Sequence, residues 1–237
     1  MAWPAQKLQA GASGPMSHAG RMRIPGVPRY GPGAQFYDIL SLECPVYRVG
    51  RSRAIELMEL KPGDRVLDIG CGTGLNFPLL RDKVGPQGHV VGVDASAAML
   101  AQARKRARSW ENVTLLEVDA GNMRPQIGSW TFDAMIVTYA LSIISDWTSA
   151  WDQAMAQLRP GARVAVVDLA LPTGIGRLFE PAARLACFTG GVTLHREPWS
   201  LVENQLSRVC LERHCLGHVV VAVGTFDENP DDQGALE

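Results

Sequence analysis

The sequence predicts an α/β fold, a Rossmann-like, doubly wound sheet of seven strands with helices on both faces. The sheet is expected to be mostly parallel, with an antiparallel C-terminal strand. Three observations predict this fold. Short apolar segments alternate with segments of helical periodicity between residues 45 and 207. Glycines at positions 70, 72 and 74 directly follow the first apolar segment. Two β-rich segments then meet at Leu216-Gly217, a pattern typical of a hairpin.

The expected strands are short apolar runs bounded by turn residues. A run of this length without alternation is typical of a strand that is buried on both faces. The seven predicted strands are residues 65–69, 89–93, 113–118, 132–137, 163–169, 208–215 and 218–225.

The expected helices lie between these strands. Ser96 is a suitable N-cap, and the cations at the end of its helix lie where the helix dipole favours positive charge. This cationic run, residues 104–108, is therefore interpreted as structural and not as an RNA-binding surface. The predicted helices are residues 45–60, 76–83, 96–108, 147–158, 177–187 and 199–207.

The most informative segment is the run LDIGCGTGL at residues 67–75. A phosphate-binding Walker loop would require a Gly-Lys-Ser/Thr sequence, which is absent after Gly70. The dinucleotide fingerprint is GxGxxG, whereas the glycines here are spaced GxGxG, with Leu75 at the third dinucleotide position. A carboxylate at Asp68 suits a cationic ligand group and would repel a pyrophosphate. The pattern therefore favours a nucleotide-type ligand that carries positive charge.

The run VLDIGCGTG at residues 66–74 resembles the first motif of the class I S-adenosylmethionine-dependent methyltransferases. The resemblance implies that Asp68 and the glycine backbone hold the methionine half of the cofactor. Asp94, 20 residues past Gly74, would accept the ribose hydroxyls, and Asp119-Ala120 would contact the adenine. The cofactor-binding residues expected from the resemblance are Asp68, Gly70, Cys71, Gly72, Gly74, Asp94, Ala95, Met99, Asp119, Ala120 and Thr138. Glycine turns and strand-terminal aspartates that cap helices also occur in other α/β domains.

The resemblance extends over residues 36–226, which are expected to form one domain with an N-terminal cap at residues 36–60. It also implies a turn at Leu158-Arg159-Pro160-Gly161 before the fifth strand. Residues 1–35 contain Lys7, Arg21, Arg23 and Arg29 and no acidic residue, and are rich in Gly and Pro. They are expected to be a flexible basic arm, because such a composition buries little apolar surface. A transit peptide is the alternative, although glycines and prolines oppose an amphipathic helix. Residues 227–237 are expected to be an acidic tail.

Composition limits the possible partners. The net charge of −1 gives no general electrostatic case for nucleic acid, and no nucleic-acid partner is expected. Five cysteines without a CxxC pair indicate a reducing, cytoplasmic location and no metal site. No apolar run reaches the roughly 18 residues of a membrane span. Oligomeric state is left open.

Methyl transfer from a sulfonium mainly requires alignment of the reactants, so a catalytic triad is not needed. Substrate contacts are expected from three segments that could cover the strand ends: residues 36–51, 138–142 and 171–199. The candidate catalytic residues are Tyr37, Tyr139 and His195. Tyr37 begins a YDxL sequence that resembles the cap of quinone-pathway and phospholipid methyltransferases, in which the tyrosine lies near cofactor and substrate. His195 is a candidate general base, or simply a surface histidine.

The substrate is expected to be a small molecule or a lipid headgroup. The segment after the fourth strand, Thr138-Tyr139-Ala140-Leu141, lacks the Pro-Pro-aromatic run of enzymes that methylate base amino groups. The chain resembles phospholipid N-methyltransferases and quinone methyltransferases most closely, and the basic arm could then contact an anionic membrane surface peripherally. Two alternatives stay open: a nicotinamide-dependent oxidoreductase, and a protein that binds S-adenosylmethionine without catalysis.

Overall fold

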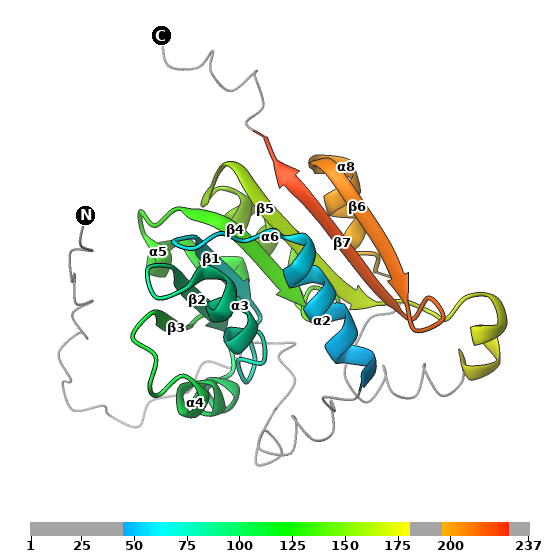
Figure 1. The fold of residues 1–237 in the computed structure, drawn as a ribbon, viewed down its shortest axis with the longest axis horizontal. Helices are drawn as coiled ribbons and strands as arrows, with labels where there is room; N and C mark the ends of the chain where they lie inside the picture. Colours follow the sequence, from blue (N-terminus) through cyan, green and yellow to red (C-terminus); the bar gives the residue numbers. More distant parts are fainter. Residues whose placement is uncertain (1–44, 181–195, 228–237) are drawn as a thin grey trace, which may run out of the picture.

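The computed structural model describes residues 45–180 and 196–227. These residues form a seven-stranded sheet in the order β3-β2-β1-β4-β5-β7-β6 (Figure 1). The predicted fold class is confirmed. The strands are β1 (Arg65–Ile69), β2 (His89–Asp94), β3 (Val113–Glu117), β4 (Phe132–Thr138), β5 (Leu158–Leu169), β6 (Ser207–His214) and β7 (Val219–Phe226).

Strands β1 to β5 run parallel to one another, and β7 runs antiparallel to both β5 and β6. The strand order reverses direction between β1 and β4, because β2 and β3 lie on one side of β1 and the later strands on the other. In open α/β sheets this reversal marks the crevice in which ligands bind. The chain therefore places its glycine-rich turn, directly after β1, at that point.

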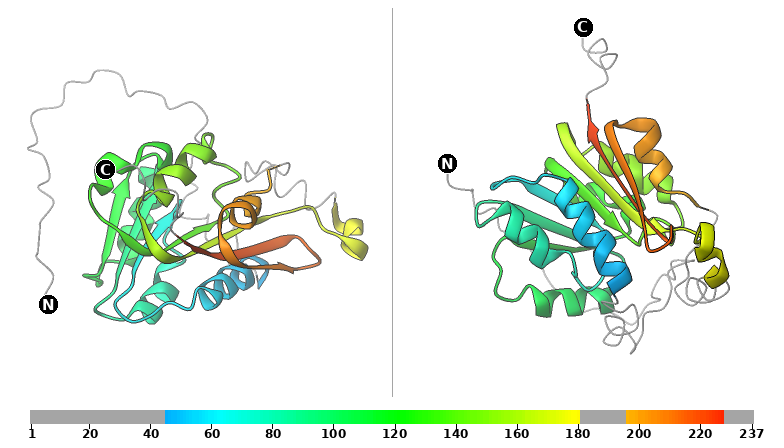
Figure 2. Two further views of the ribbon diagram at one scale, coloured as in Figure 1. Left: turned by 90° about the horizontal axis from the view of Figure 1, so that it is seen from above. Right: turned by 45° about the vertical axis from the view of Figure 1, so that its right-hand side comes forward.

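Helices cover both faces of the sheet (Figure 2). One face packs against α2, α3 and α4, and the other against α6 and α8. The helices are α2 (Pro45–Leu57), α3 (Phe77–Val84), α4 (Ala97–Arg106), α5 (Arg124–Ile127), α6 (Trp147–Met155) and α8 (Trp199–Gln205), with 3-10 helices η1 (Ala120–Asn122) and η2 (Gly174–Phe179).

The strand pleat divides the core into two layers. Val66 and Ile136 pack toward α2 and α3, whereas their neighbours Leu67 and Met135 pack toward α6. Alternate side chains point to opposite faces of a strand, so each central strand supplies both layers. Asp68 has the same parity as Val66, and its carboxylate therefore points to the α2 and α3 side.

Several predicted boundaries are wrong. The segment Leu158 to Gly161 was predicted as a turn, but it belongs to β5. A bulge accommodates it: Phe132 pairs with Leu158 and Ala134 pairs with Arg163, and Gly161 has a left-handed φ of 83°. Because Leu158 joins the sheet, α6 ends at Met155, short of the predicted 158.

Other differences concern short helices. The helix α2 ends at Leu57, not at residue 60, and the predicted helix 177–187 begins as a 3-10 helix at Gly174. Residues 181–187 lie outside the described part. The helices η1 and α5 were not predicted, although Asp119 caps the first and a proline lies in the first turn of the second.

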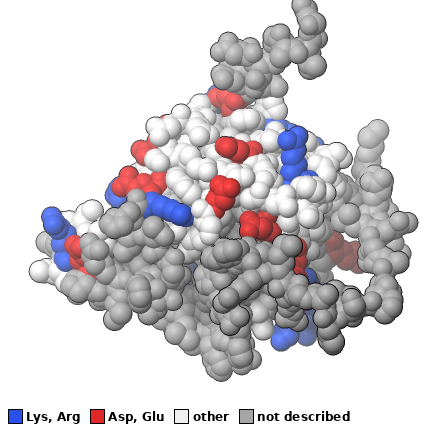
Figure 3. Space-filling model, turned by 180° about the vertical axis from the view of Figure 1, so that it is seen from behind, with Lys and Arg blue, Asp and Glu red and all other residues white. Residues whose placement is uncertain are grey.

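Three expected features lie wholly or partly outside the described residues: the basic arm 1–35, residues 36–44 of the cap, and the tail beyond Asp227. Within the described ranges no helix is long and apolar enough to cross a membrane. On the face shown in Figure 3, acidic and basic side chains of described residues are interspersed, without a continuous basic surface.

Candidate cofactor site

The candidate site lies at the carboxyl ends of β1, β2 and β4. The turn after β1 carries the three motif glycines in the left-handed region, with φ of 63° at Gly70, 55° at Gly72 and 78° at Gly74. Side chains with a Cβ rarely adopt this conformation, so the spacing GxGxG is required by the path of the backbone. The turn is fixed to β2 because the Cys71 N–H donates to the carbonyl oxygen of Val93 at 3.0 Å.

The glycines differ in what surrounds them. A Cβ at Gly70 would lie 2.4 Å from the Cβ of Ala140, and one at Gly74 would lie 2.4 Å from the Phe77 ring. A Cβ at Gly72 would meet nothing within 4 Å. Packing therefore explains two of the glycines, whereas the backbone of Gly72 borders open space into which a ligand could fit.

Asp68 is the central charged group of the site. Its side chain is fully buried near the end of β1, and burial raises its pKa to about 7 from an ordinary value of 3.8. One carboxylate oxygen, Oδ1, accepts a hydrogen bond from Asn76 Nδ2 at 2.9 Å. The other, Oδ2, is buried and has no hydrogen-bond partner among the described residues. A buried carboxylate oxygen without a donor is costly, and a cationic ligand group would satisfy it.

Asn76 links Asp68 to two further elements. Its Oδ1 accepts from Arg51 Nε of α2 at 2.7 Å, and its Nδ2 lies 3.1 Å from Thr138 Oγ1 at the end of β4. Arg51 is only 8% exposed, and its positive charge lowers the pKa of Asp68 against the larger effect of burial. Asn76 and Arg51 were not among the predicted site residues. The asparagine directly after the glycines was the available signal for the first.

Asp94 is oriented by two backbone donors. Its Oδ2 accepts from the Gly72 N–H and its Oδ1 from the Ser96 N–H, each at 2.8 Å. Burial raises the pKa of Asp94, and the two N–H donors oppose that rise. The carboxylate therefore ties the glycine turn to the start of α4. The role of Asp94 toward a ribose stays a prediction.

The remaining predicted cofactor residues lie along the same edge. Asp119 caps η1, because its Oδ1 accepts from the Gly121 N–H at 2.8 Å, and Ala120 is buried beside it. Met99 is buried on α4, and Ala95 is half-buried before it. Burial raises the pKa of the Cys71 thiol, which makes this cysteine an apolar packing group.

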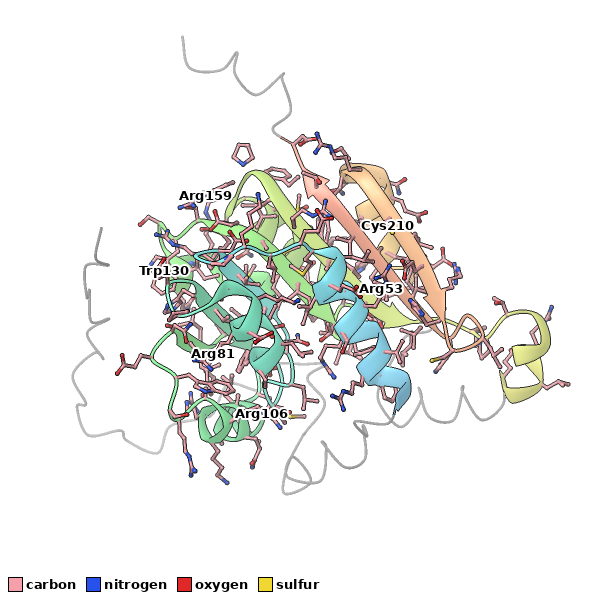
Figure 4. The ribbon with its side chains drawn as sticks, in the orientation of Figure 1. Arg53, Arg81, Arg106, Trp130, Arg159 and Cys210 are labelled. Carbon is pink, nitrogen blue, oxygen red and sulfur yellow. The ribbon has the colours of Figure 1, made fainter. Side chains whose placement is uncertain are left out.

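The far side of the turn is fixed by α4. Arg106 lies at the end of that helix (Figure 4). It donates from Nη1 to the carbonyl oxygen of Thr73, and the same nitrogen lies 3.3 Å from Thr73 Oγ1. The motif turn is therefore fastened by hydrogen bonds from three sides: from β2, from α4 and, through Asn76, from α2.

Tyr139, a candidate catalytic residue in the sequence analysis, contacts α2. Its hydroxyl donates to the carbonyl oxygen of Tyr47 on α2 at 2.8 Å, and the two rings meet edge to face with centroids 5.2 Å apart. Burial raises the pKa of the Tyr139 phenol. The hydroxyl therefore holds α2 against the loop after β4, and its catalytic role stays a prediction. Its φ of 56° shows that the backbone turns sharply directly after β4.

Asp168 is a buried carboxylate that was not predicted. Its Oδ1 accepts from Ser142 Oγ and from the Leu169 N–H, both at 2.8 Å, and its Oδ2 accepts from the Ser142 N–H at 3.0 Å. Burial raises its pKa to about 6. With these donors, Asp168 holds the loop after β4 against the end of β5. An aspartate at the end of an apolar strand was the only sequence signal.

Two predicted catalytic residues, Tyr37 and His195, lie outside the described residues. Arg196, next to His195, is described, and its Nη1 donates to the carbonyl oxygen of Ile144 in the loop after β4. The segment preceding α8 therefore reaches the edge of the site at residue 196. No group of three or more His, Cys, Asp and Glu residues in the described ranges is arranged to hold a metal ion.

Comparison with known proteins agrees with this geometry. Residues 66–161 match a family model described as a methyltransferase domain. The match begins at β1 and includes the glycine turn, Asp94, Asp119 and Thr138. This part of the chain is therefore similar to methyltransferase domains.

Two curated proteins to which this chain is similar are named as quinone methyltransferases. The chain is 34% identical over 142 residues to a 2-phytyl-1,4-naphtoquinone methyltransferase of Synechococcus elongatus, covering 59% of this chain and 61% of that protein. It is 32% identical over 136 residues to a demethylmenaquinone methyltransferase of Staphylococcus aureus, covering 57% of this chain and 55% of that protein. The alignments thus span about three fifths of these relatives.

Several solved methyltransferase structures share the fold of this chain. A methyltransferase from Aquifex aeolicus has a TM-score of 0.59 at 17% identity, covering 81% of this chain and 98% of its own. A phosphoethanolamine N-methyltransferase from Haemonchus contortus, solved with phosphomonomethylethanolamine and S-adenosylhomocysteine, has a TM-score of 0.63 at 15% identity. That match covers 83% of this chain and 57% of the solved chain.

Proposed function

We propose that this protein is an S-adenosylmethionine-dependent methyltransferase that acts on a small molecule by in-line methyl transfer. The observation that carries the proposal is the buried Oδ2 of Asp68, which has no hydrogen-bond partner in the described part of the chain. It lies beside a glycine turn whose central residue borders open space. An ammonium or sulfonium would compensate the buried carboxylate, whereas a pyrophosphate would be repelled by it.

The residues present fit this cofactor. Asp68, Gly70, Cys71, Gly72 and Gly74 would hold the methionine half. Carboxylates at Asp94 and Asp119 suit a ribose and an adenine amino group, with Ala95, Met99, Ala120 and Thr138 alongside. The reported relatives are methyltransferases, and none of these observations favours a nicotinamide-dependent oxidoreductase.

The bound cofactor would supply an activated methyl group, so the chain's own task is alignment and exclusion of water. Holding two reactants in register contributes about 7–11 kcal/mol to lowering a barrier. The buried hydrogen bonds of Asp68, Asp94 and Asp168 give the site a fixed shape before any ligand binds. Tyr37 and His195 stay proposals as substrate-contacting residues, the first in the pocket and the second as a general base.

The proposed methyl acceptor is a quinone-type small molecule, with a lipid headgroup as the second possibility. The names of the two curated relatives support the quinone, and the Haemonchus structure, which binds phosphomonomethylethanolamine, supports a headgroup amine. We further propose a cytoplasmic location with peripheral contact between the basic arm, residues 1–35, and anionic membranes. Deleting residues 1–33 should then reduce binding to vesicles that contain phosphatidylglycerol, and unchanged binding would remove the membrane proposal.

The function is tested with methyl-labelled S-adenosylmethionine and the full-length protein. One reaction contains a reduced demethylated naphthoquinone and another contains phosphatidylethanolamine vesicles. Label in the quinone supports the proposal, and label only in the phospholipid replaces the quinone by the headgroup. Label in neither acceptor, nor in any fraction of a cell extract, would contradict a methyltransferase. Tyr37→Phe and His195→Ala are then compared by kcat, and a change below threefold in either excludes that residue from catalysis.

A further inference from the structure

The buried arginine of α2 has no role in the proposed function described so far. Arg51 lies on the side of α2 that faces the sheet, and its side chain is 8% exposed. Arginine is rarely buried in this way unless it is paired. Its Nε reaches Asn76 at the start of α3, 25 residues further along the chain. The contact therefore joins the helix that precedes β1 to the turn that follows it.

Asn76 is used in an unusual way for its position. It is the N-cap residue of α3, where an asparagine side chain ordinarily accepts from a backbone N–H of the first turn, yet it makes no capping hydrogen bond. Its amide instead lies between Arg51 and Asp68, with distances of 2.7 Å and 2.9 Å to the two partners. The Asn76 side chain therefore links two charged groups and does not stabilise the start of α3 as a cap.

The chemistry of the three groups fixes the direction of this link. A guanidinium can only donate and an ionised carboxylate can only accept, so the Asn76 oxygen must face Arg51 and its nitrogen must face Asp68. In this orientation Asn76 holds Asp68 Oδ1, and Oδ2 is left for a ligand. Because all three side chains are buried, the electrostatic effect of Arg51 on Asp68 is weakly screened.

We propose that Arg51 is a positioning residue of the cofactor cradle, by which we mean Asp68 and the glycine turn of residues 70–74. Arg51 acts through Asn76 to orient Asp68 and to favour its ionised form. A consequence is that docking of α2 and binding of the cofactor stabilise each other, since such coupling is reciprocal. This inference rests on the proposed function. Arg51 reaches the cradle from α2, the same helix that Tyr139 anchors through the Tyr47 carbonyl.

The first test is calorimetric titration of the full-length protein with S-adenosylhomocysteine, whose ammonium is charged between pH 6 and 9. Arg51→Met is compared with Arg48→Met, which removes an exposed arginine from the same helix. We expect Arg51→Met to weaken binding by roughly tenfold or more and Arg48→Met to leave it unchanged. Arg51→Lys should restore part of the affinity, because it keeps the charge but loses the geometry of Nε.

The pH dependence separates positioning from a general loss of packing. The charged and titratable groups that act on Asp68 are Arg51 from α2 and Asp94 from the end of β2, and Asp68 in turn acts on the thiol of Cys71 in the same turn. Arg51 lowers the pKa of Asp68. In Arg51→Met, the affinity for S-adenosylhomocysteine should therefore begin to fall at a pH that is higher by roughly one unit. A variant that only loosened the fold would weaken binding equally at every pH.

Two further measurements test the link, and the second of them needs no Arg51 variant. Asn76→Ala breaks the link while Arg51 stays, and in a double-mutant cycle the second substitution should add little to the loss of affinity caused by the first. In the unmodified protein, S-adenosylhomocysteine should slow amide hydrogen exchange in residues 45–57. Full additivity of the two substitutions, or unchanged exchange in α2, would overturn the inference.

The outcomes for the inference and for the proposed function are distinguishable. If the unmodified protein binds S-adenosylhomocysteine and Arg51→Met binds it with the same affinity and the same pH midpoint, the inference is overturned and the proposed function stands. If the unmodified protein binds no S-adenosylhomocysteine, both are overturned.

Discussion

At the scale of single residues, the buried carboxylate of Asp68 is unfavourable for stability but suits a cationic ligand. A carboxyl group with a pKa of about 7 is partly neutral near physiological pH, and its unpartnered oxygen makes the ionised form unfavourable in the ligand-free protein. A residue that served only stability would carry a hydrogen-bonded or apolar side chain here. Strongly perturbed carboxylates of this kind concentrate at functional sites.

The pKa of Asp68 leads to a prediction about stability. Its folded-state pKa is raised, so its stabilising contribution is complete below about pH 4 and is lost as pH rises toward 7. Asp68→Asn cannot ionise and should avoid this loss. Relative to the unmodified protein without ligand, its free energy of unfolding should therefore rise by about 2–3 kcal/mol between pH 5 and pH 8. Urea unfolding at both pH values measures this, and exposed Asp82→Asn is the control. A decrease at pH 8 would contradict the assignment.

Gly72 allows backbone strain to be separated from ligand contact. Gly72 and Gly128 both have a left-handed φ, 55° and 63°, and a Cβ at either would meet no atom within 4 Å. Substitution by alanine should therefore cost each a similar amount of stability, about 1–2 kcal/mol. Only Gly72→Ala should also weaken binding of S-adenosylhomocysteine, by roughly tenfold or more. Equal affinities of the two variants in calorimetry would show that no ligand approaches the turn at Gly72.

At the scale of elements, α2 is fastened to the site at several points and packs along β5 and β7. Tyr139 supplies one point through the Tyr47 carbonyl, and Arg51 supplies another through Asn76. Arg53 adds a more exposed link to Glu212 on β6, with distances of 2.7 Å and 2.9 Å (Figure 4). This ion pair lowers the pKa of Glu212 to about 2. Exposed pairs of this type contribute little to stability, so the buried links dominate.

Tyr139→Phe distinguishes two roles of the Tyr139 hydroxyl: holding α2 in place, and the catalytic role expected from the sequence. Loss of the hydroxyl should lower the free energy of unfolding by about 1 kcal/mol, because the Tyr47 carbonyl loses its donor. The kcat for methyl transfer should change by less than threefold, since the hydroxyl is engaged with α2. Denaturant unfolding and steady-state kinetics on one preparation give both numbers. A hundredfold fall in kcat with unchanged stability would instead support the catalytic role.

The elements also show what sequence patterns can predict. The bounds of β1 were predicted correctly, because an apolar run between Asp64 and a glycine turn leaves little freedom. The start of β5 was not, since Leu158-Arg159-Pro160-Gly161 has the composition of a turn and enters the sheet only through a bulge against β4. That bulge depends on tertiary pairing, which local propensity does not contain.

At the scale of the whole molecule, the two core layers bring distant segments to one edge of the sheet. The motif made it possible to predict Asp68, the three glycines and Asp94 as a group, because their spacing along successive strand ends is local information. Arg51 and Asp168 could not be found in this way. Their roles depend on contacts across 25 residues to Asn76 and 26 residues to Ser142.

The most direct test is a calorimetric titration of the full-length protein with S-adenosylhomocysteine and, separately, with NAD, at pH 8. We predict one S-adenosylhomocysteine site per chain and no NAD binding. Asp68→Asn should weaken the S-adenosylhomocysteine interaction by about 10-fold to 100-fold, the value of a charged hydrogen bond, whereas Asp82→Asn should leave it unchanged. Absence of S-adenosylhomocysteine binding by the unmodified protein, or equal affinity after Asp68→Asn, would contradict a methyltransferase cradle built on this carboxylate.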